Sequence, residues 1–490
     1  MTLHDHDSEV SPVARDERRP YGVSRRRRRG RRAFAWVAGV VVLVLAGGAA
    51  TAYRMGWLDD WLGDQPAPLA VPVPGYQAPV APTPRAVARP APRARPQTAP
   101  VRRALAAPLQ DPDLFDLRAV VAPLSGAPLL DEGHGVSMPA STLKLLTTSA
   151  ALETLGPGHT FATRVVADGR ADGHPGILLV GGGDPFLAGA QPRTGPARHD
   201  ASLQSLARLT AAKLRASGSH EVRLAYDTSL FTGPRVNPHW PASYLPDVVS
   251  PITALWADEG LNPSGYGRVP DPPATAAGMF ATFLRKDGIE VEPTITQTKA
   301  GAHARELARV TSLPLADIVE RILQFSDNEG AEVLAHQVGL AVMGQGSYAA
   351  GVRGVTRTLT GLGLDLHGAT IQDGSGLSRN DRVDAETLVQ VLQLASSPTH
   401  PELRSVVTGL PVAAYDGSLR YRFDDSPGRG LVRAKTGTLS GTSALAGITT
   451  DARGHVLVFA FVSNHVNEAD TLDTRAALDH LAATLATCRC

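Results

Sequence analysis

Residues 141–155 have the sequence STLKLLTTSAALETL, which predicts a helix entered just after Pro139 and ended by Gly156-Pro157. Side chains three positions apart share one face of a helix, so the Ser141 hydroxyl and the Lys144 amine are expected within hydrogen-bonding reach. A serine is a weak nucleophile unless a base stands beside it, and a buried lysine can lose its proton and serve as that base. Ser141 and Lys144 are therefore a candidate nucleophile and base, with a spacing that chance also produces.

Lysine is rare in this chain, which has 5 lysines and 43 arginines. Arginine stays charged under all ordinary conditions, whereas a desolvated lysine can give up its proton. A lysine retained against this background is a candidate for chemistry that arginine cannot perform. Two of the five, Lys144 and Lys435, lie in short motifs.

A second motif, Ser326-Asp327-Asn328, lies between two helices predicted over residues 315–325 and 331–342. Its hydroxyl can relay a proton, and its amide can hold a substrate carbonyl. Taken alone, the motif is explained by a helix cap at least as well as by a catalytic role.

A third motif, Lys435-Thr436-Gly437-Thr438, lies on a predicted strand ahead of a turn. The edge of a strand offers backbone groups that can pair with an extended peptide. Gly437 lets that backbone approach closely, and Lys435 supplies charge for a carboxylate that the threonine hydroxyls can also bind. In isolation, an exposed strand end explains the motif equally well.

The two ends of the globular part of the chain carry the strand-like segments. A last helix is predicted over residues 471–487. Strands at both ends with helices between them predict an α+β domain whose antiparallel sheet is completed by both chain ends. The predicted strands lie at residues 117–122, 128–131, 432–438, 443–449 and 456–463.

Together and in this order, the three motifs resemble the signature set of penicillin-binding proteins and serine β-lactamases. Four more segments narrow the resemblance to the D-alanyl-D-alanine carboxypeptidase/endopeptidase family, the class C low-molecular-mass penicillin-binding proteins of peptidase family S13. The resemblance spans roughly residues 111–485. The four segments are GGGDP at 181–185, DGSGLSR at 373–379, LPV at 410–412 and DGSLR at 416–420.

The resemblance implies a fold and a division of the chain. The expected fold is a penicillin-binding-protein/serine β-lactamase-like domain, in which helices flank an antiparallel sheet and form a helical subdomain. An inserted accessory domain separates the first two motifs. The catalytic domain would comprise residues 107–160 and 301–490, and the insertion residues 161–300.

The resemblance also implies roles for the motif residues. Ser141 would be acylated, Lys144 would be the base, and Ser326 and Asn328 would assist proton transfer and substrate placement. The catalytic set would be completed by Lys435.

The substrate's terminal carboxylate would be bound by Lys435 together with Thr436, Gly437 and Thr438, and the N–H groups of Ser141 and Thr438 would form an oxyanion hole. Arg379 would contact the diamino-acid side chain of the stem peptide. The family often supplies an acidic residue for that contact just after a Gly-Trp pair. Here His239-Trp240 stands at that place, and Asp247 is the only acidic candidate.

The implied activity is a serine D,D-peptidase that cleaves the D-Ala-D-Ala end of peptidoglycan stem peptides, with cross-links as a possible second target. β-Lactams would inhibit it, and neither metal nor cofactor is expected. A net charge of +1 gives no reason to expect a nucleic-acid partner. Two alternatives stay open, namely a β-lactamase or esterase on the same scaffold and a non-catalytic cell-wall-binding scaffold.

The N-terminus predicts export. Arginines between residues 25 and 32 precede Ala33–Ala52, 20 uncharged and mostly apolar residues, which indicates a single transmembrane anchor at 33–53 behind a cytoplasmic tail of residues 1–32. A Pro/Ala/Arg-rich linker at 54–106, extended at least from 65 to 103, would carry the catalytic part outside the membrane. The alternative is secretion after signal cleavage at Ala50-Thr51-Ala52. Cys488 and Cys490 are expected to lie unpaired in a terminal tail.

Overall fold

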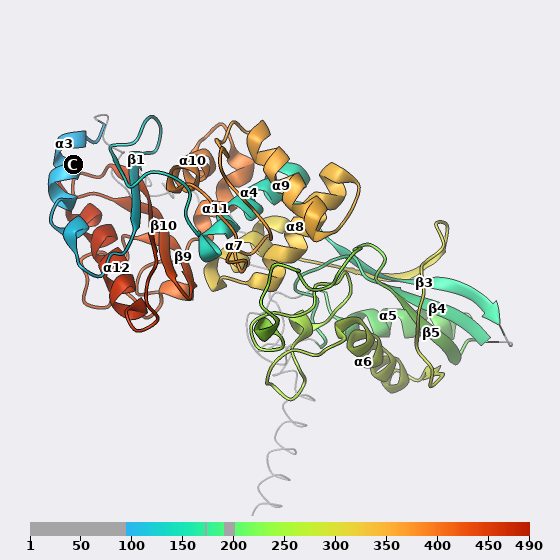
Figure 1. Cartoon of the computed structure of the whole chain (residues 1–490). Helices are drawn as coiled ribbons and strands as arrows, with labels where there is room; N and C mark the ends of the chain where they lie inside the picture. Colours follow the sequence, from blue (N-terminus) through green and yellow to red (C-terminus); the bar gives the residue numbers. More distant parts are fainter. Residues whose placement is uncertain (1–94, 172–173, 191–200) are drawn as a thin grey trace, which may run out of the picture. The chain divides into compact units, whose positions relative to one another are not determined.

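The computed structural model describes residues 95–171, 174–190 and 201–490 (Figure 1). The predicted cytoplasmic tail, membrane anchor and most of the linker lie outside the described residues. Within the described part of the chain, none of the helices combines the length and the apolar character that a membrane crossing requires.

A five-stranded antiparallel sheet joins the two ends of the described chain. The order β2-β1-β11-β10-β9 places β1 beside β11, with Val120 opposite Ala460. The predicted hairpin and three-stranded meander are therefore confirmed. The strands are β1 Leu117–Pro123, β2 Leu130–Glu132, β9 Arg433–Leu439, β10 Thr442–Thr450 and β11 Val456–Asn464.

Both faces of this sheet are buried. Side chains alternate along a strand, so Phe459 and Phe461 of β11 face one core and Ala460 and Val462 the other. The first face packs against the last helix, α12 Thr471–Thr487, whose predicted limits are confirmed. The second face packs against the layer of helices that carries the first two motifs (Figure 1).

The helical layer is built around α4 Lys144–Leu155, which continues a short 3-10 turn, η3 Ala140–Leu143. One prediction was wrong here, because α8 begins at Asn328 rather than at residue 331. The Asp327 carboxylate accepts a hydrogen bond from Gly330 N–H (2.7 Å) and caps the helix three residues earlier. The other helices are α7 Leu315–Phe325, α8 Asn328–Met343, α9 Tyr348–Gly361, α10 Ala385–Ser396 and α11 Arg404–Thr408.

The region between the first two motifs forms a second sheet with a core of its own. Its order is β6-β5-β4-β3-β8, with β7 beside β5, and helices α5 Leu203–Ala216 and α6 Pro272–Lys286 pack against it (Figure 1). Strand β8 follows residue 300, so the sheet extends past the boundary predicted there. The strands are β3 Ala162–Ala171, β4 His174–Val180, β5 Glu221–Asp227, β6 Glu290–Val291, β7 Thr296–Gln297 and β8 Glu306–Thr311.

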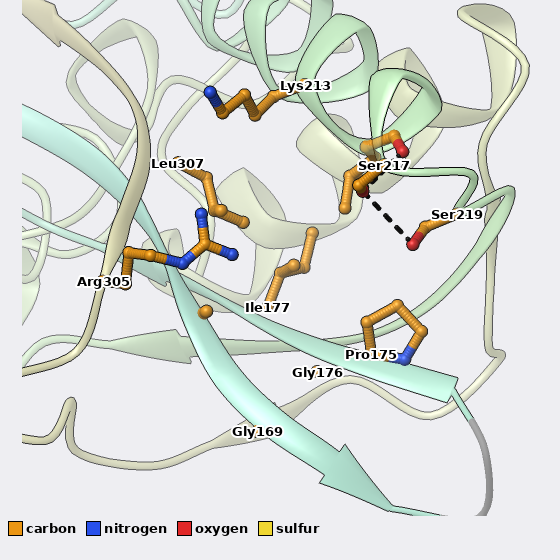
Figure 2. Close-up of a pocket in the computed structure, with 11 residues that line it drawn as sticks. Gly169, Pro175, Gly176, Ile177, Lys213, Ser217, Ser219, Arg305 and Leu307 are labelled. Carbon is orange, nitrogen blue, oxygen red and sulfur yellow. Dashed lines mark hydrogen bonds between the residues drawn. The ribbon is translucent and has the colours of Figure 1, made fainter.

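This second sheet also borders a pocket of about 280 Å³ (Figure 2). Lys213 and Arg305 lie on its wall, together with Ser217 and Ser219, whose hydroxyl oxygens are 3.5 Å apart. None of the motif residues lines it. The pocket therefore belongs to the second sheet and not to the motif chemistry.

The end of the predicted linker is helical rather than extended. Helix α3 Thr98–Leu105 buries Val101 and Leu105 in the core beside α12. Its proline, Pro100, stands in the first turn, where a backbone N–H has no helical partner to lose. The prediction of an extended spacer through residue 103 was wrong, because burial of these two apolar side chains stabilises a helix here.

The prediction of an unpaired cysteine tail was also wrong. A disulfide joins Cys488 and Cys490, whose Cα atoms are 5.3 Å apart, and both residues are buried. The backbone around them is held by two hydrogen bonds, from Gln97 N–H to Cys490 O and from Ala452 N–H to Cys488 O. The tail therefore completes the core beneath α3 and is not a free end.

Candidate active site

Ser141 and Lys144 lie where the 3-10 turn passes into α4. Lys144 Nζ is 2.9 Å from Ser141 Oγ, 2.8 Å from Asn328 Oδ1 and 2.7 Å from the Ser375 carbonyl oxygen. The contacts come from three separate segments of the chain. Tertiary folding has therefore placed the amine between the serine of the first motif and the asparagine of the second.

The Lys144 side chain is completely buried. Loss of hydration lowers the pKa of its amine to about 8, against an opposing effect of nearby carboxyl groups, chiefly Asp373 and Glu332. At pH 8 about half of such an amine is unprotonated. This is the property that a lysine base requires.

Ser326 lies at the joint between α7 and α8. Its backbone is left-handed (φ 61°), which ends α7. Its Oγ accepts a hydrogen bond of 2.8 Å from Lys435 Nζ, so the second and third motifs are in direct contact. The motif acts as a helix cap as well as a site element, because Asp327 caps α8 while Ser326 and Asn328 meet the two lysines.

Lys435 lies on β9 and is completely buried. Besides Ser326, its Nζ contacts the carbonyl of Thr436 at 2.8 Å. Burial, together with the positive charges of Lys144 and Arg422, lowers the pKa of this amine well below its usual value. The hydroxyl of Thr436 donates to Ser418 Oγ (2.8 Å), which connects β9 to the 416–420 segment.

Strand β9 is the edge of its sheet. Ala434 N–H donates outward to Pro411 O, and the two-residue period of a strand directs the N–H groups of Thr436 and Thr438 to the same outer edge. Ser141 is the second residue of its 3-10 turn, a position whose N–H has no partner within the helix. Unpaired backbone donors thus come from both the turn and the strand.

Two glycines allow the segments to approach one another. A Cβ on Gly437 would lie 2.8 Å from Pro139 O, so only glycine lets β9 pack against the turn before Ser141. At Gly376 (φ +81°) a Cβ would lie 2.0 Å from Ala140 O. Both positions require glycine because backbone occupies the space of a side chain.

Several contributors were missed by sequence reasoning. The Ser375 carbonyl contacts Lys144 directly, and the carboxylates of Glu332 and Asp373 bind the backbone around it. The 373–379 segment was recognisable as a motif, but a backbone carbonyl has no signature in a sequence. Glu332 follows Asn328 by one helical turn, and that spacing was the available signal.

The two residues expected to contact the stem side chain are not joined to the motif residues. Arg379 and Asp247 are both exposed, and among the described residues no hydrogen bond or ion pair links either side chain to the motif side chains. Their role in substrate selection stays a prediction.

The arrangement of a half-buried serine beside a buried lysine, a Ser-x-Asn joint and a Lys-Thr-Gly edge strand agrees with the comparison to known families. The model of the D-Ala-D-Ala carboxypeptidase 3 (S13) family matches residues 101–265 and 262–485, most of the chain. The chain belongs to this family. Its members are serine-type D-Ala-D-Ala carboxypeptidases, and the chain is an enzyme of that type.

Individual relatives support the same family assignment. The chain is 37% identical over 392 residues to a carboxypeptidase of Mycobacterium tuberculosis, a match that covers 78% of this chain and 82% of that protein. A D-alanyl-D-alanine carboxypeptidase of Actinomadura sp. strain R39 is 30% identical over 430 residues, covering 70% and 77% of the two chains.

The crystal structure of penicillin binding protein 4 from Haemophilus influenzae has a TM-score of 0.66 and 22% identity to this chain. The match covers 79% of this chain and 98% of the Haemophilus influenzae protein. This structural similarity shows that the enzyme has the α+β fold of penicillin-binding proteins and β-lactamases.

Proposed function

We propose that the enzyme cleaves the D-Ala-D-Ala end of peptidoglycan stem peptides through an acyl-enzyme on Ser141. The observation that carries the proposal is the contact of the buried Lys144 amine with both Ser141 and Asn328. An unprotonated amine has two N–H bonds and one lone pair. If the N–H groups donate to Asn328 Oδ1 and Ser375 O, the lone pair faces the Ser141 hydroxyl.

In this mechanism Ser141 Oγ attacks the carbonyl carbon of the penultimate D-Ala while its proton passes to Lys144 Nζ. The N–H groups of Ser141 and Thr438 stabilise the negative charge on the carbonyl oxygen. The C–N bond breaks, the terminal D-Ala leaves with a proton, and water then hydrolyses the ester. The leaving amine takes up the proton that Lys144 received, with the Ser326 hydroxyl as the proposed relay, and the contact with Lys435 holds that hydroxyl in place.

The terminal carboxylate of the substrate would be held by Lys435, Thr436 and Thr438. A buried lysine with a lowered pKa gains from such a partner, because the incoming negative charge favours the protonated amine. Gly437 lets β9 pack against the turn that carries Ser141, and the outer edge of β9 offers backbone groups to an extended peptide. Arg379 is proposed to reach the diamino-acid side chain from its exposed position.

The experiment is to incubate the purified full-length chain with disaccharide-pentapeptide muropeptides and with cross-linked dimers, and to follow products by mass. Loss of one D-Ala from the monomers is the expected result, and Ser141→Ala should abolish it. Splitting of dimers would add endopeptidase activity. If neither substrate changes, the peptidase assignment of this site is wrong.

A fluorescent penicillin separates the remaining alternatives. A stable label that disappears in Ser141→Ala is expected of a penicillin-binding peptidase, in line with the β-lactam bound in one Haemophilus influenzae relative. Rapid hydrolysis of the drug would instead indicate a β-lactamase. Absence of both label and hydrolysis would favour the non-catalytic scaffold.

We also propose that the enzyme is a single-pass membrane protein with its catalytic part outside the cytoplasm. The support is the arginine cluster before Ala33–Ala52 and the location of the proposed substrate in the cell wall. Protease added to intact spheroplasts should remove the catalytic part and leave an N-terminal membrane fragment. Recovery of the whole chain from the medium would favour a cleaved signal peptide.

A further inference from the structure

A buried carboxylate lies behind the turn that contacts Lys144. Asp373 is 2% exposed, and its Oδ1 accepts hydrogen bonds from the N–H groups of Ser375 (3.1 Å) and Gly376 (2.7 Å). Its Oδ2 accepts from Ser378 N–H and from the indole N–H of Trp240, both at 2.7 Å. Four donors on one carboxylate hold the 374–378 turn from inside.

A second carboxylate supports the same turn from α8. Glu332 is fully buried and accepts hydrogen bonds from the N–H groups of Gly374 (3.0 Å) and Ser375 (2.8 Å). It lies one helical turn after Asn328, on the same face of α8. The two carboxylates thus share Ser375, with its N–H directed toward them and its carbonyl toward Lys144.

Asp381 has the properties of a neutral acid in this group. Its Oδ1 accepts from Gln372 N–H (2.7 Å), while its buried Oδ2 meets no donor among the described residues. Burial and the adjacent Asp373 carboxylate raise the pKa of Asp381 to about 10, so it carries a proton at neutral pH. A protonated Asp381 is a donor, which suits a place beside the hydrogen-bond-accepting carboxylate of Asp373.

We propose that Asp373 is the positioning residue of the catalytic base: it fixes the turn that presents the Ser375 carbonyl to Lys144, and Trp240 ties it to the region between the first two motifs. The inference rests on the proposed role of Lys144 as the base. A lysine side chain has four rotatable bonds, so its lone pair is directed at Ser141 only if its other contacts are fixed. Asp373 fixes one of them without touching the reacting atoms.

The proposal also concerns the charge around the base. Removal of the Asp373 charge makes the protonated amine less favourable, so the pKa of Lys144 should fall further. Lys144 is surrounded by acidic groups from two segments, residues 327–332 and the 373–378 turn, and by one cation from β9. These groups are Asp373, Glu332, Asp327, Glu329 and Lys435.

The test is the second-order rate of acylation by a fluorescent penicillin, measured on the full-length enzyme from pH 5.5 to 9.5. In Asp373→Asn the rate at pH 8 should fall about 100-fold, the scale of a misplaced catalytic group, and the rising limb of the pH profile should move to lower pH. Trp240→Phe keeps an aromatic side chain, though a smaller one, and removes the indole N–H donor, so it should lower the rate less and leave the limb nearer its original position.

Asp381 offers a pair of conservative and disruptive changes. Asp381→Asn keeps a neutral donor of the same shape and should retain most of the acylation rate, whereas Asp381→Leu should lower it toward that of Asp373→Asn. The matched control is Asp451→Asn, which removes a buried carboxylate paired with His455 at the distant β10–β11 turn. It should change the melting temperature but not the pH profile.

The inference is overturned if Asp373→Asn keeps the original rate and limb, or if Asp381→Asn is as impaired as Asp381→Leu. Should Asp373→Asn fail to fold, Trp240→Phe and the Asp381 pair decide, and an unchanged rate in both Trp240→Phe and Asp381→Leu contradicts the proposal. If the unaltered enzyme takes no label at all, the proposed function itself fails, which distinguishes the two outcomes.

Discussion

Lys144 is the residue on which the chemistry depends, and only Lys144 and Lys435 among the five lysines are buried. Lys144 is completely buried and contacts Ser141, Asn328 and Ser375, whereas Lys213 is an exposed residue of α5. The sequence suggested that Asn328 holds the substrate. In the structure its Oδ1 contacts Lys144, so the same side chain also orients the base.

Replacement of Lys144 by arginine should lower acylation of Ser141 by about 10²–10⁴-fold, because a guanidinium cannot give up its proton. Labelling by fluorescent penicillin measures the effect. Lys213→Arg is the control and should keep the original rate. Equal rates in the two variants would exclude Lys144 as the base.

The pH dependence of acylation follows from the pKa of about 8 at Lys144. The base is active when unprotonated, so the rate should rise about tenfold for each pH unit below 8 and level off above it. Stopped-flow measurement of penicillin acylation between pH 5.5 and 9.5 tests this. A rate independent of pH across 6 to 8 would contradict it.

At the scale of elements, the site depends on backbone segments that approach closely. The turn before Ser141 is contacted by the 373–378 turn on one side and by β9 on the other, through Gly376 and Gly437. Neither approach tolerates a side chain.

Gly376→Ala should therefore lower acylation about 100-fold, because its Cβ would lie 2.0 Å from Ala140 O and displace the nucleophile turn. Gly344→Ala is a matched control, since Gly344 has a similar φ of +73° but open space around it. The control should lose only about 1–2 kcal/mol of stability through backbone strain. Acylation rates and chemical denaturation of both variants provide the measurement, and equal loss of activity would refute the steric explanation.

Helix α3 makes the last part of the predicted linker a component of the fold. Leu105→Ala should destabilise the protein by about 2–5 kcal/mol, because the side chain is fully buried beside α12. Arg103→Ala, on an exposed residue of the same helix, should change stability by less than about 0.5 kcal/mol. Urea denaturation checks both. A similar midpoint for the two variants would mean that α3 contributes no packing energy.

At the scale of the whole molecule, several buried carboxyl groups couple stability to pH. Burial raises the pKa of Asp184 to about 7, of Glu259 to about 8, and of Asp381 to about 10. Each group binds its proton more tightly in the folded than in the unfolded chain. The stabilisation from these protons is therefore present at low pH and is lost as the pH rises through the folded values.

The free energy of unfolding should consequently fall between about pH 5 and pH 8, by about 1.4 kcal/mol per pH unit for each group that remains protonated only in the folded state. Chemical denaturation at pH 5, 6.5 and 8 measures the slope. Asp184→Asn should flatten it, because the amide does not titrate. Stability that increases steadily over this range would contradict the shifts.

The three motifs, the strands that close the five-stranded sheet and the final helix could be predicted from the sequence, because each depends on local spacing or periodicity. The sequence predicted the limits of α7 well for the same reason. It failed at Asn328, where a side-chain cap starts α8 early, and at α3 and the Cys488–Cys490 disulfide, where burial in a distant core decides the conformation.

The groups that surround the catalytic pair could be identified only once the chain was folded. Ser141 and Lys144 are neighbours on one turn, so their contact follows from sequence. The Ser375 carbonyl lies 231 residues from Lys144, and Trp240 lies 133 residues from Asp373. Contacts of this kind depend on how separate segments pack, and a backbone carbonyl carries no residue signature. The nucleophile and base could therefore be identified in the sequence, whereas the group that directs the base could be identified only in the fold.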